Sequence, residues 1–275
     1  MNLSLRQLLS IAVGFVFLAA SPAQTTDKKS QAPELPGRIF HATFDMESAD
    51  ADDANTIGVL AAKPSGGKEI HFEDGLRGRA FRGGGSADSA QALLYARDGI
   101  LSFESPGTVN FWFKPAGWKT SEQIFESRAG DAPATLSFEE RARDPLWETS
   151  YTSNRGSLGI QRISSPIRGS KDTLMFYIFL NDRSRTTEVM SFDWTPNEWF
   201  MLSITWSPTD VQIYLNGELL KMFTPPEDLR DDLFSGNFQV GGPPNPTLFD
   251  EISVYDRALT SDEVLSLYNA FRVAR

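Results

Sequence analysis

Apolar and polar residues alternate in short runs along most of the chain, and this period of two is typical of β-strands. In residues 38–44, Phe40, Ala42 and Phe44 fall on one face. Residues 173–180 are apolar at nearly every position, which predicts a central strand covered on both faces. Further strands are predicted by the runs 108–114, 157–163, 199–206, 237–242 and 248–255.

Turn and cap residues mark the ends of these elements. A hairpin is predicted at 211–220, because Asn216-Gly217 suits a type I′ turn, which needs positive φ at both central residues. One helix is predicted near the C-terminus, where Thr260 and Glu263 can form a capping box. An apolar stripe follows the cap and consists of Val264, Leu267, Tyr268 and Phe271.

The segment 126–170 is the least regular part of the chain. It mixes charges with several glycines and with Pro133, Pro145 and Pro166, so we expect long loops on either side of the 157–163 strand. Short strands, turn residues and hardly any helix predict an all-β sandwich or barrel.

The N-terminus has the pattern of a secretion signal. Arg6 precedes an apolar run at 8–20, and small residues follow it, so we expect residues 1–23 to be a cleaved signal peptide. The alternative is an uncleaved membrane anchor, for which the run is short. Residues 24–37 have the composition of a disordered linker, and we expect one domain over 38–275. The protein is then secreted, in the periplasm or outside the cell.

Charge and cysteine content exclude several classes of function. The formal net charge is −10, so neither nucleic acid nor an anionic membrane surface is an expected partner. The chain has no cysteine, which excludes disulfides, thiolate metal sites and a cysteine nucleophile.

Four segments together resemble the LamG-like jelly-roll domains of the concanavalin A-like lectin/glucanase superfamily. They read "GLRGRAFRGGG" (75–85), "GTVNFWFKP" (107–115), "NEWFMLSITWSPTDVQIYLNGELL" (197–220) and "LFDEISVYDRALTSDEVLSLYN" (248–269). The last of them is the most specific, and the resemblance covers nearly all of 38–270. It implies a two-sheet antiparallel jelly-roll sandwich, with one concave and one convex sheet and a short C-terminal helix. It also implies that the N- and C-terminal strands are neighbours.

Asp250 interrupts the last strand. Ile252 and Val254 are in phase with it, so we expect its carboxylate near the core-facing side, where it needs a partner. One interpretation is that Asp250 accepts backbone N–H groups or contacts an arginine. The other is a structural Ca²⁺, which such domains often hold between the N-terminal region and the closing strand; Asp45 is then the best second ligand.

Catalytic patterns are missing from the sequence. Retaining glycosidases of this superfamily carry a pair of carboxylates at alternate positions of a strand, and neither Glu-x-Asp-x-x-Glu nor Glu-x-Asp-x-Glu occurs. Neither His41 nor His71 belongs to a metal-binding motif. We therefore expect no enzymatic activity.

A sugar site needs aromatic rings beside polar groups. Trp118, Trp147 and Tyr151 lie in irregular segments and are the predicted ligand-binding residues. The competing explanation is that these rings fasten long loops to the sandwich.

Three hypotheses for the function remain at this point. The favoured one is a non-catalytic binding module for a carbohydrate or a cell-surface or other extracellular protein. The second is a structural or assembly component of an envelope or matrix, and the third is a divergent glycosidase or lyase.

Overall fold

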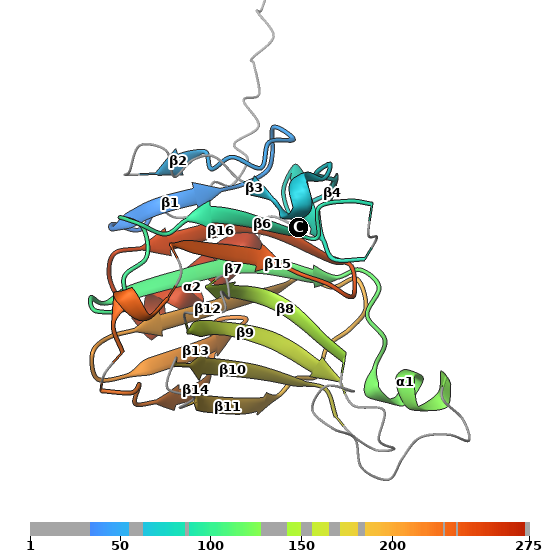
Figure 1. Cartoon of the computed structure of the whole chain (residues 1–275). Coiled ribbons are helices and arrows are strands. Elements are labelled where there is room, and N and C mark those ends of the chain that lie inside the picture. The colour runs from blue at the N-terminus through green and yellow to red at the C-terminus, as the bar shows by residue number, and fades with distance from the viewer. Residues whose placement is uncertain are drawn as a thin grey trace, which may run out of the picture.

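The fold is a sandwich of two antiparallel β-sheets with a helix on the outside (Figure 1). The structure is a computed structural model. It describes residues 34–54, 63–85, 88–127, 142–149, 156–164, 171–180, 185–227, 229–234 and 236–272.

Sheet A contains nine of the strands in these ranges, in the order β14-β13-β12-β7-β16-β1-β2, with β5 also pairing with β16 and β4 with β5. These strands are β1 (Arg38–Ala42), β2 (Asp53–Ala54), β4 (Phe72–Asp74), β5 (Arg79–Gly83), β7 (Gly107–Pro115), β12 (Phe200–Trp206), β13 (Val211–Leu215), β14 (Glu218–Phe223) and β16 (Thr247–Tyr255).

Sheet B contains seven described strands in the order β11-β10-β9-β8-β15-β6-β3. These strands are β3 (Lys63–Pro64), β6 (Ala92–Ala96), β8 (Ala142–Thr149), β9 (Ser157–Ser164), β10 (Thr173–Phe179), β11 (Arg185–Ser191) and β15 (Asn237–Gly241). The described helices are α1 (Ser121–Ser127), α2 (Ser261–Arg272) and two short 3₁₀ turns, η1 (Ser65–Gly67) and η3 (Asp231–Leu233).

The main core lies between the two sheets. Alternate residues of each strand point into it, as Val109, Phe111 and Phe113 of β7 do. A second apolar cluster covers the outer face of sheet A, where Trp112 and Met201 meet the stripe of α2. The middle strands of sheet A are therefore buried on both faces, and α2 supplies the outer layer.

Several predicted details are confirmed. The strands β1 and β16 pair side by side, and Asn216 and Gly217 have φ values of 53° and 84°. The capping box of α2 forms, because the amide of Thr260 donates to Oε2 of Glu263 at 2.9 Å. The prediction of an all-β sandwich with a C-terminal helix is correct.

The loop prediction for 126–170 is wrong in one place. Residues Ala142–Thr149 form β8, which pairs with both β9 and β15. Pro145 discouraged a strand assignment, but it lies at a register shift between Pro145 and Trp147, where the proline does not interrupt a regular ladder. The strand β10 is covered on both faces as predicted, but it lies next to the edge strand β11 rather than in the centre.

The predicted face of Asp250 is also wrong. In β16 the pairing with β7 shifts between Asp250 and Ser253, and Glu251 there has a φ of 52°. This bulge adds one residue, so Asp250 pairs with Trp112 on the outer face while Val254 still points into the core. A strict alternation through residues 248–255 cannot anticipate the change of face.

Residues 1–33 lie outside the described residues, so the signal peptide and most of the 24–37 linker stay predictions. The first strand begins at Arg38. Among the described residues, no helix has the length and apolarity that a membrane span requires.

Candidate functional site

Asp250 holds a neighbouring loop by backbone hydrogen bonds. It is fully buried. Its Oδ2 accepts the amides of Leu76 at 2.8 Å and Arg77 at 3.2 Å, and its Oδ1 accepts the amide of Glu251 at 2.9 Å. These contacts correspond to the first interpretation of this carboxylate, in which backbone N–H groups satisfy it.

The loop in turn contacts helix α2. The guanidinium carbon of Arg77 lies 4.0 Å from the ring centroid of Phe271, and Nη2 donates to the carbonyl of Ala270 at 3.4 Å. Asp250 therefore connects the closing strand to the last turn of the helix through a loop that is distant in sequence.

Burial raises the pKa of Asp250 well above its ordinary value, and the neighbouring Glu251 raises it further. The backbone amides of Leu76 and Arg77 oppose this shift, because they stabilise the charged form. Glu251 itself contacts Nε2 of His41 at 3.0 Å.

Asp45, the other predicted metal ligand, contacts the same loop from its far end. Its Oδ1 accepts the amide of Arg79 at 3.3 Å, and its side chain is exposed. A Cβ added at Gly78, where φ is 49°, would lie 2.0 Å from that oxygen, so glycine is required for this approach.

The predicted calcium site stays a prediction. Both carboxylates contact one loop, but Asp250 directs its oxygens at three N–H groups, which are donors that do not coordinate a cation. Among the described residues, no three His, Cys, Asp or Glu side chains are grouped as metal ligands. The arrangement fits a hydrogen-bonded carboxylate better than a calcium ligand.

The predicted sugar-binding aromatics are buried where the structure describes them. Trp118 is 5% exposed and stacks on Phe113 at 6.0 Å, and Trp147 is 0% exposed on the inner face of β8. Tyr151 lies outside the described residues. The burial of Trp118 and Trp147 favours the competing explanation, in which these rings pack segments onto the sandwich.

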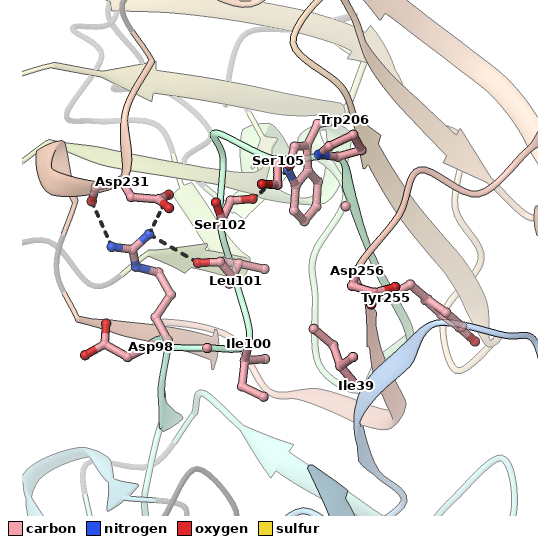
Figure 2. A pocket seen from close by; sticks show the side chains of 14 residues that line it. Ile39, Asp98, Ile100, Leu101, Ser102, Ser105, Trp206, Asp231, Tyr255 and Asp256 are labelled. Atoms are coloured by element: carbon pink, nitrogen blue, oxygen red, sulfur yellow. Dashed lines mark hydrogen bonds and ion pairs between the residues drawn. The ribbon is translucent and has the colours of Figure 1, made fainter. Parts of the chain in front are cut away.

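A cleft opens at one end of the sandwich, and we call it the end cleft (Figure 2). Its volume is about 320 Å³. It is formed by the segment that joins β6 to β7, the start of β1, the ends of β12 and β16, and η3. Its lining residues are Ile39, Arg97, Asp98, Gly99, Ile100, Leu101, Ser102, Ser105, Pro106, Gly107, Trp206, Asp231, Tyr255 and Asp256.

Trp206 forms one wall of the end cleft. Its Nε1 donates to the carbonyl oxygens of Ser102 at 2.8 Å and Ser105 at 2.9 Å, so the ring is fixed. A Cβ on Gly107, its partner across the strands, would lie 2.2 Å from Cζ2 of the indole. Only glycine lets the ring lie across the start of β7.

An ion pair fixes another wall. Arg97 donates to Oδ1 of Asp231 at 3.1 Å and to its carbonyl oxygen at 2.8 Å, as the dashed lines in Figure 2 show. Oδ1 of Asp231 also accepts the amide of Phe103 at 2.7 Å. The segment between β6 and β7 is therefore held against η3 before any ligand enters.

The rim of the end cleft is polar and acidic. Figure 2 shows Asp98 and Asp256 on opposite sides, with Ile39 and Ile100 between them. Both carboxylates are exposed, as is Ser105, whereas the two isoleucines are buried. With Asp231 and Arg97, the lining contains three carboxylates and one guanidinium, so the cleft repels anions and suits hydroxyl groups or cations.

Sequence reasoning missed this cleft. Trp206 is the last residue of the predicted strand 199–206, and the segment "RDGILSFESPG" (97–107) carries no known motif. Its only signal was a loop rich in Asp, Ser, Gly and Pro between two strands, which indicates a turn but not its neighbours.

Comparisons with known proteins agree with this architecture. A family model of the concanavalin A-like lectin/glucanases superfamily matches residues 86–265. No curated protein matches the chain.

Similar solved structures include toxin binding domains. The chain resembles the binding domain of Paraclostridial Mosquitocidal Protein 1, with a TM-score of 0.59, 16% identity, and coverage of 86% of this chain and 52% of that one. The binding domain of Botulinum Neurotoxin DC in complex with SialylT has a TM-score of 0.62 at 16% identity, with 86% and 51% covered. The binding domain of the same neurotoxin in complex with rat synaptotagmin II has a TM-score of 0.62 at 15% identity, with 86% of this chain and 52% of that one covered.

The chain spans about half of each of these structures, and identities this low establish the fold alone. The family model matches more than half of the chain. Together with the two-sheet sandwich, this match shows that the chain belongs to the concanavalin A-like lectin/glucanase superfamily.

Proposed function

We propose that this chain is a secreted, non-catalytic binding module that takes a neutral carbohydrate in the end cleft. The observation that carries the proposal is the composition of that cleft, with its apolar residues between exposed carboxylates and hydroxyls. Sugars present apolar C–H faces and hydroxyls that both donate and accept, so such a lining suits them.

Two further points support a binding role. The walls of the cleft are held by hydrogen bonds of Trp206 and Arg97, so little order is lost on binding. Similar structures include a binding domain in complex with SialylT and one in complex with synaptotagmin. The acidic rim favours uncharged sugars over sialylated ones in this chain.

The test is a glycan array probed with residues 24–275, followed by calorimetric titration of the best neutral glycan. Ser105→Phe should fill the cleft and abolish binding there, and Asp98→Ala should weaken it. Both residues are exposed, so folding should be preserved. Arg230→Ala, at an exposed ion pair outside the cleft, is the control. Equal binding by Ser105→Phe and the wild type would refute the end cleft as the site.

A non-catalytic role has its own test. The carboxylates of the cleft come from three separate elements, and Asp231 is already paired with Arg97. We expect no release of reducing ends when the bound glycan is incubated with the protein. Hydrolysis that Asp98→Ala or Asp256→Ala abolishes would establish a glycosidase instead.

One observation favours the second candidate, a structural or assembly component. Val189 on edge strand β11, and Leu219 and Met222 on edge strand β14, are at least half exposed. These two strands form one border of the sandwich (Figure 1). Self-association that Leu219→Lys and Met222→Lys abolish, without loss of glycan binding, would support this role.

A further inference from the structure

A second pocket lies on the outer face of sheet A, beside helix α2. We call it the helix pocket; its volume is about 210 Å³, and it shares no lining residue with the end cleft. Its lining residues are Trp112, Glu198, Trp199, Phe200, Asn216, Tyr268, Phe271 and Arg272. The helix pocket contains Phe200 at the start of β12, and the end cleft contains Trp206 at its end, so about 20 Å of strand separate them.

Aromatic rings build the helix pocket. Trp112 and Tyr268 stack with centroids 5.7 Å apart and an interplanar angle of 16°. Trp112 is 3% exposed, whereas Tyr268 and Trp199 are only partly buried. The deep ring therefore anchors α2, and the two outer rings have surface left for a ligand.

Charged and amide groups surround these rings. Arg272 lies 6.0 Å from the ring centroid of Tyr268, and Lys114 lies 5.1 Å from that of Trp199. Glu198 and Arg272 are exposed. The pocket thus offers both donors and an acceptor, and it carries fewer acidic groups than the end cleft.

The turn that carries Asn216 is held firmly. Oδ1 of Asn216 accepts the amide of Met201 at 2.9 Å, which fixes the side-chain amide beside the pocket. A Cβ on Gly217 would lie 2.9 Å from Cδ1 of Leu265, so the turn packs closely against the helix. The pocket is therefore built before binding.

We propose that the helix pocket is a second carbohydrate site, which accepts one pyranose ring. Trp199 and Tyr268 would cover a C–H face of the sugar, and Asn216, Glu198 and Arg272 would bond its hydroxyls, which both donate and accept. Rings that only fastened α2 to the sheet would need neither partial exposure nor this mixed polar border. This second site does not depend on the end cleft.

The test uses saturation-transfer difference NMR with the methyl glycosides of glucose, galactose, mannose and N-acetylglucosamine. We expect at least one glycoside to receive saturation in a protein that carries Ser105→Phe, because that variant blocks only the end cleft. Trp199→Leu should lower the affinity for that glycoside about tenfold, the size of effect that one aromatic contact produces.

Two surface variants keep the test independent of folding. Glu198→Ala and Arg272→Ala change exposed side chains, and each should weaken binding about threefold or more. The melting temperature of every variant should stay near that of wild type. The proposal is overturned if no glycoside binds the Ser105→Phe protein, or if binding survives both Trp199→Leu and Arg272→Ala. If Ser105→Phe leaves the binding of every glycoside unchanged while Trp199→Leu weakens it, the proposed function is refuted but the helix pocket is supported.

Discussion

Two groups of buried carboxylates in this sandwich are stabilised in different ways. Asp250 accepts three backbone amides and contacts no basic side chain among its hydrogen bonds. Asp144 and Asp172 instead flank Arg162, with oxygen–nitrogen distances of 2.8 and 2.9 Å. All of these carboxylates are at most 7% exposed.

The arginine cluster is an interior network of side chains. Arg162 is fully buried, and its guanidinium lies 4.9 Å from the ring centroid of Trp118 and 5.2 Å from that of Trp194. Asp172 also accepts a hydrogen bond from the hydroxyl of Ser121, at the start of α1. This cluster depends on one cation, whereas Asp250 depends on the conformation of a loop. The comparison predicts that removing Arg162 lowers the stability of the protein more than removing Asp250, which accepts the amides of the loop.

The largest expected effect is that of Arg162→Ala. It leaves Asp144 and Asp172 buried without a counter-charge, so we expect a loss of about 3–5 kcal/mol in the free energy of unfolding. Urea unfolding followed by fluorescence measures it. Arg230→Ala, at an exposed pair with Asp232, should lose less than about 1 kcal/mol. Equal losses in the two variants would contradict the role given to Arg162.

Asp250→Ala should have the next largest effect. It removes the acceptor of three amides, and we expect a loss of about 2–3 kcal/mol by urea unfolding. Asp250→Asn should lose only about 1 kcal/mol, because one amide oxygen can still accept the amides of Leu76 and Arg77. If Asp250→Ala and Asp250→Asn are equally destabilising, Asp250 stabilises the fold through its charge and not through its hydrogen bonds to the loop.

The pH dependence of stability should separate Asp250 from Glu263. The raised pKa of Asp250 means that the folded state binds its proton more tightly, so its contribution is complete below the ordinary value of 3.8 and is lost as pH rises through the folded pKa. Arg257 lowers the pKa of Glu263 to about 2, so its contribution is present above 4.5 and is lost as pH falls toward 2.

Melting temperatures of the wild type and of the two variants, recorded at several pH values from about 3 to about 7, measure these opposite pH dependences. The stability of wild type relative to Asp250→Asn should fall as pH rises, and that relative to Glu263→Gln should rise. Parallel curves for the two comparisons would show that these carboxyl groups do not titrate as described.

The smallest expected effect is that of calcium. Since backbone amides already occupy the oxygens of Asp250, Ca²⁺ added to chelator-treated protein should leave the melting temperature unchanged. Asp45→Ala, at an exposed carboxylate, should change it by little in either condition. A calcium-dependent rise that Asp250→Ala abolishes would instead establish the predicted metal site.

Local rules in the sequence were sufficient for most of the long strands and for helix α2. The alternation of residues 38–44 and the apolar run 173–180 predicted β1 and β10. The Asn216-Gly217 pair and the Thr260 cap were predicted from residues within four positions of each other, and both form. Such signals hold because backbone geometry at a turn or a cap depends on the residues in it.

The face of Asp250, the strand at 142–149 and both pockets were decided only by the tertiary structure. One extra residue in a bulge turned Asp250 outward, because side chains alternate with a period of exactly two and any insertion reverses the following phase. The end cleft joins segments near residues 39, 97–107, 206, 231 and 255, and their proximity follows from strand order. The sequence by itself therefore determined most of the long strands, helix α2 and the family, whereas long-range packing decided which side chains meet at a site.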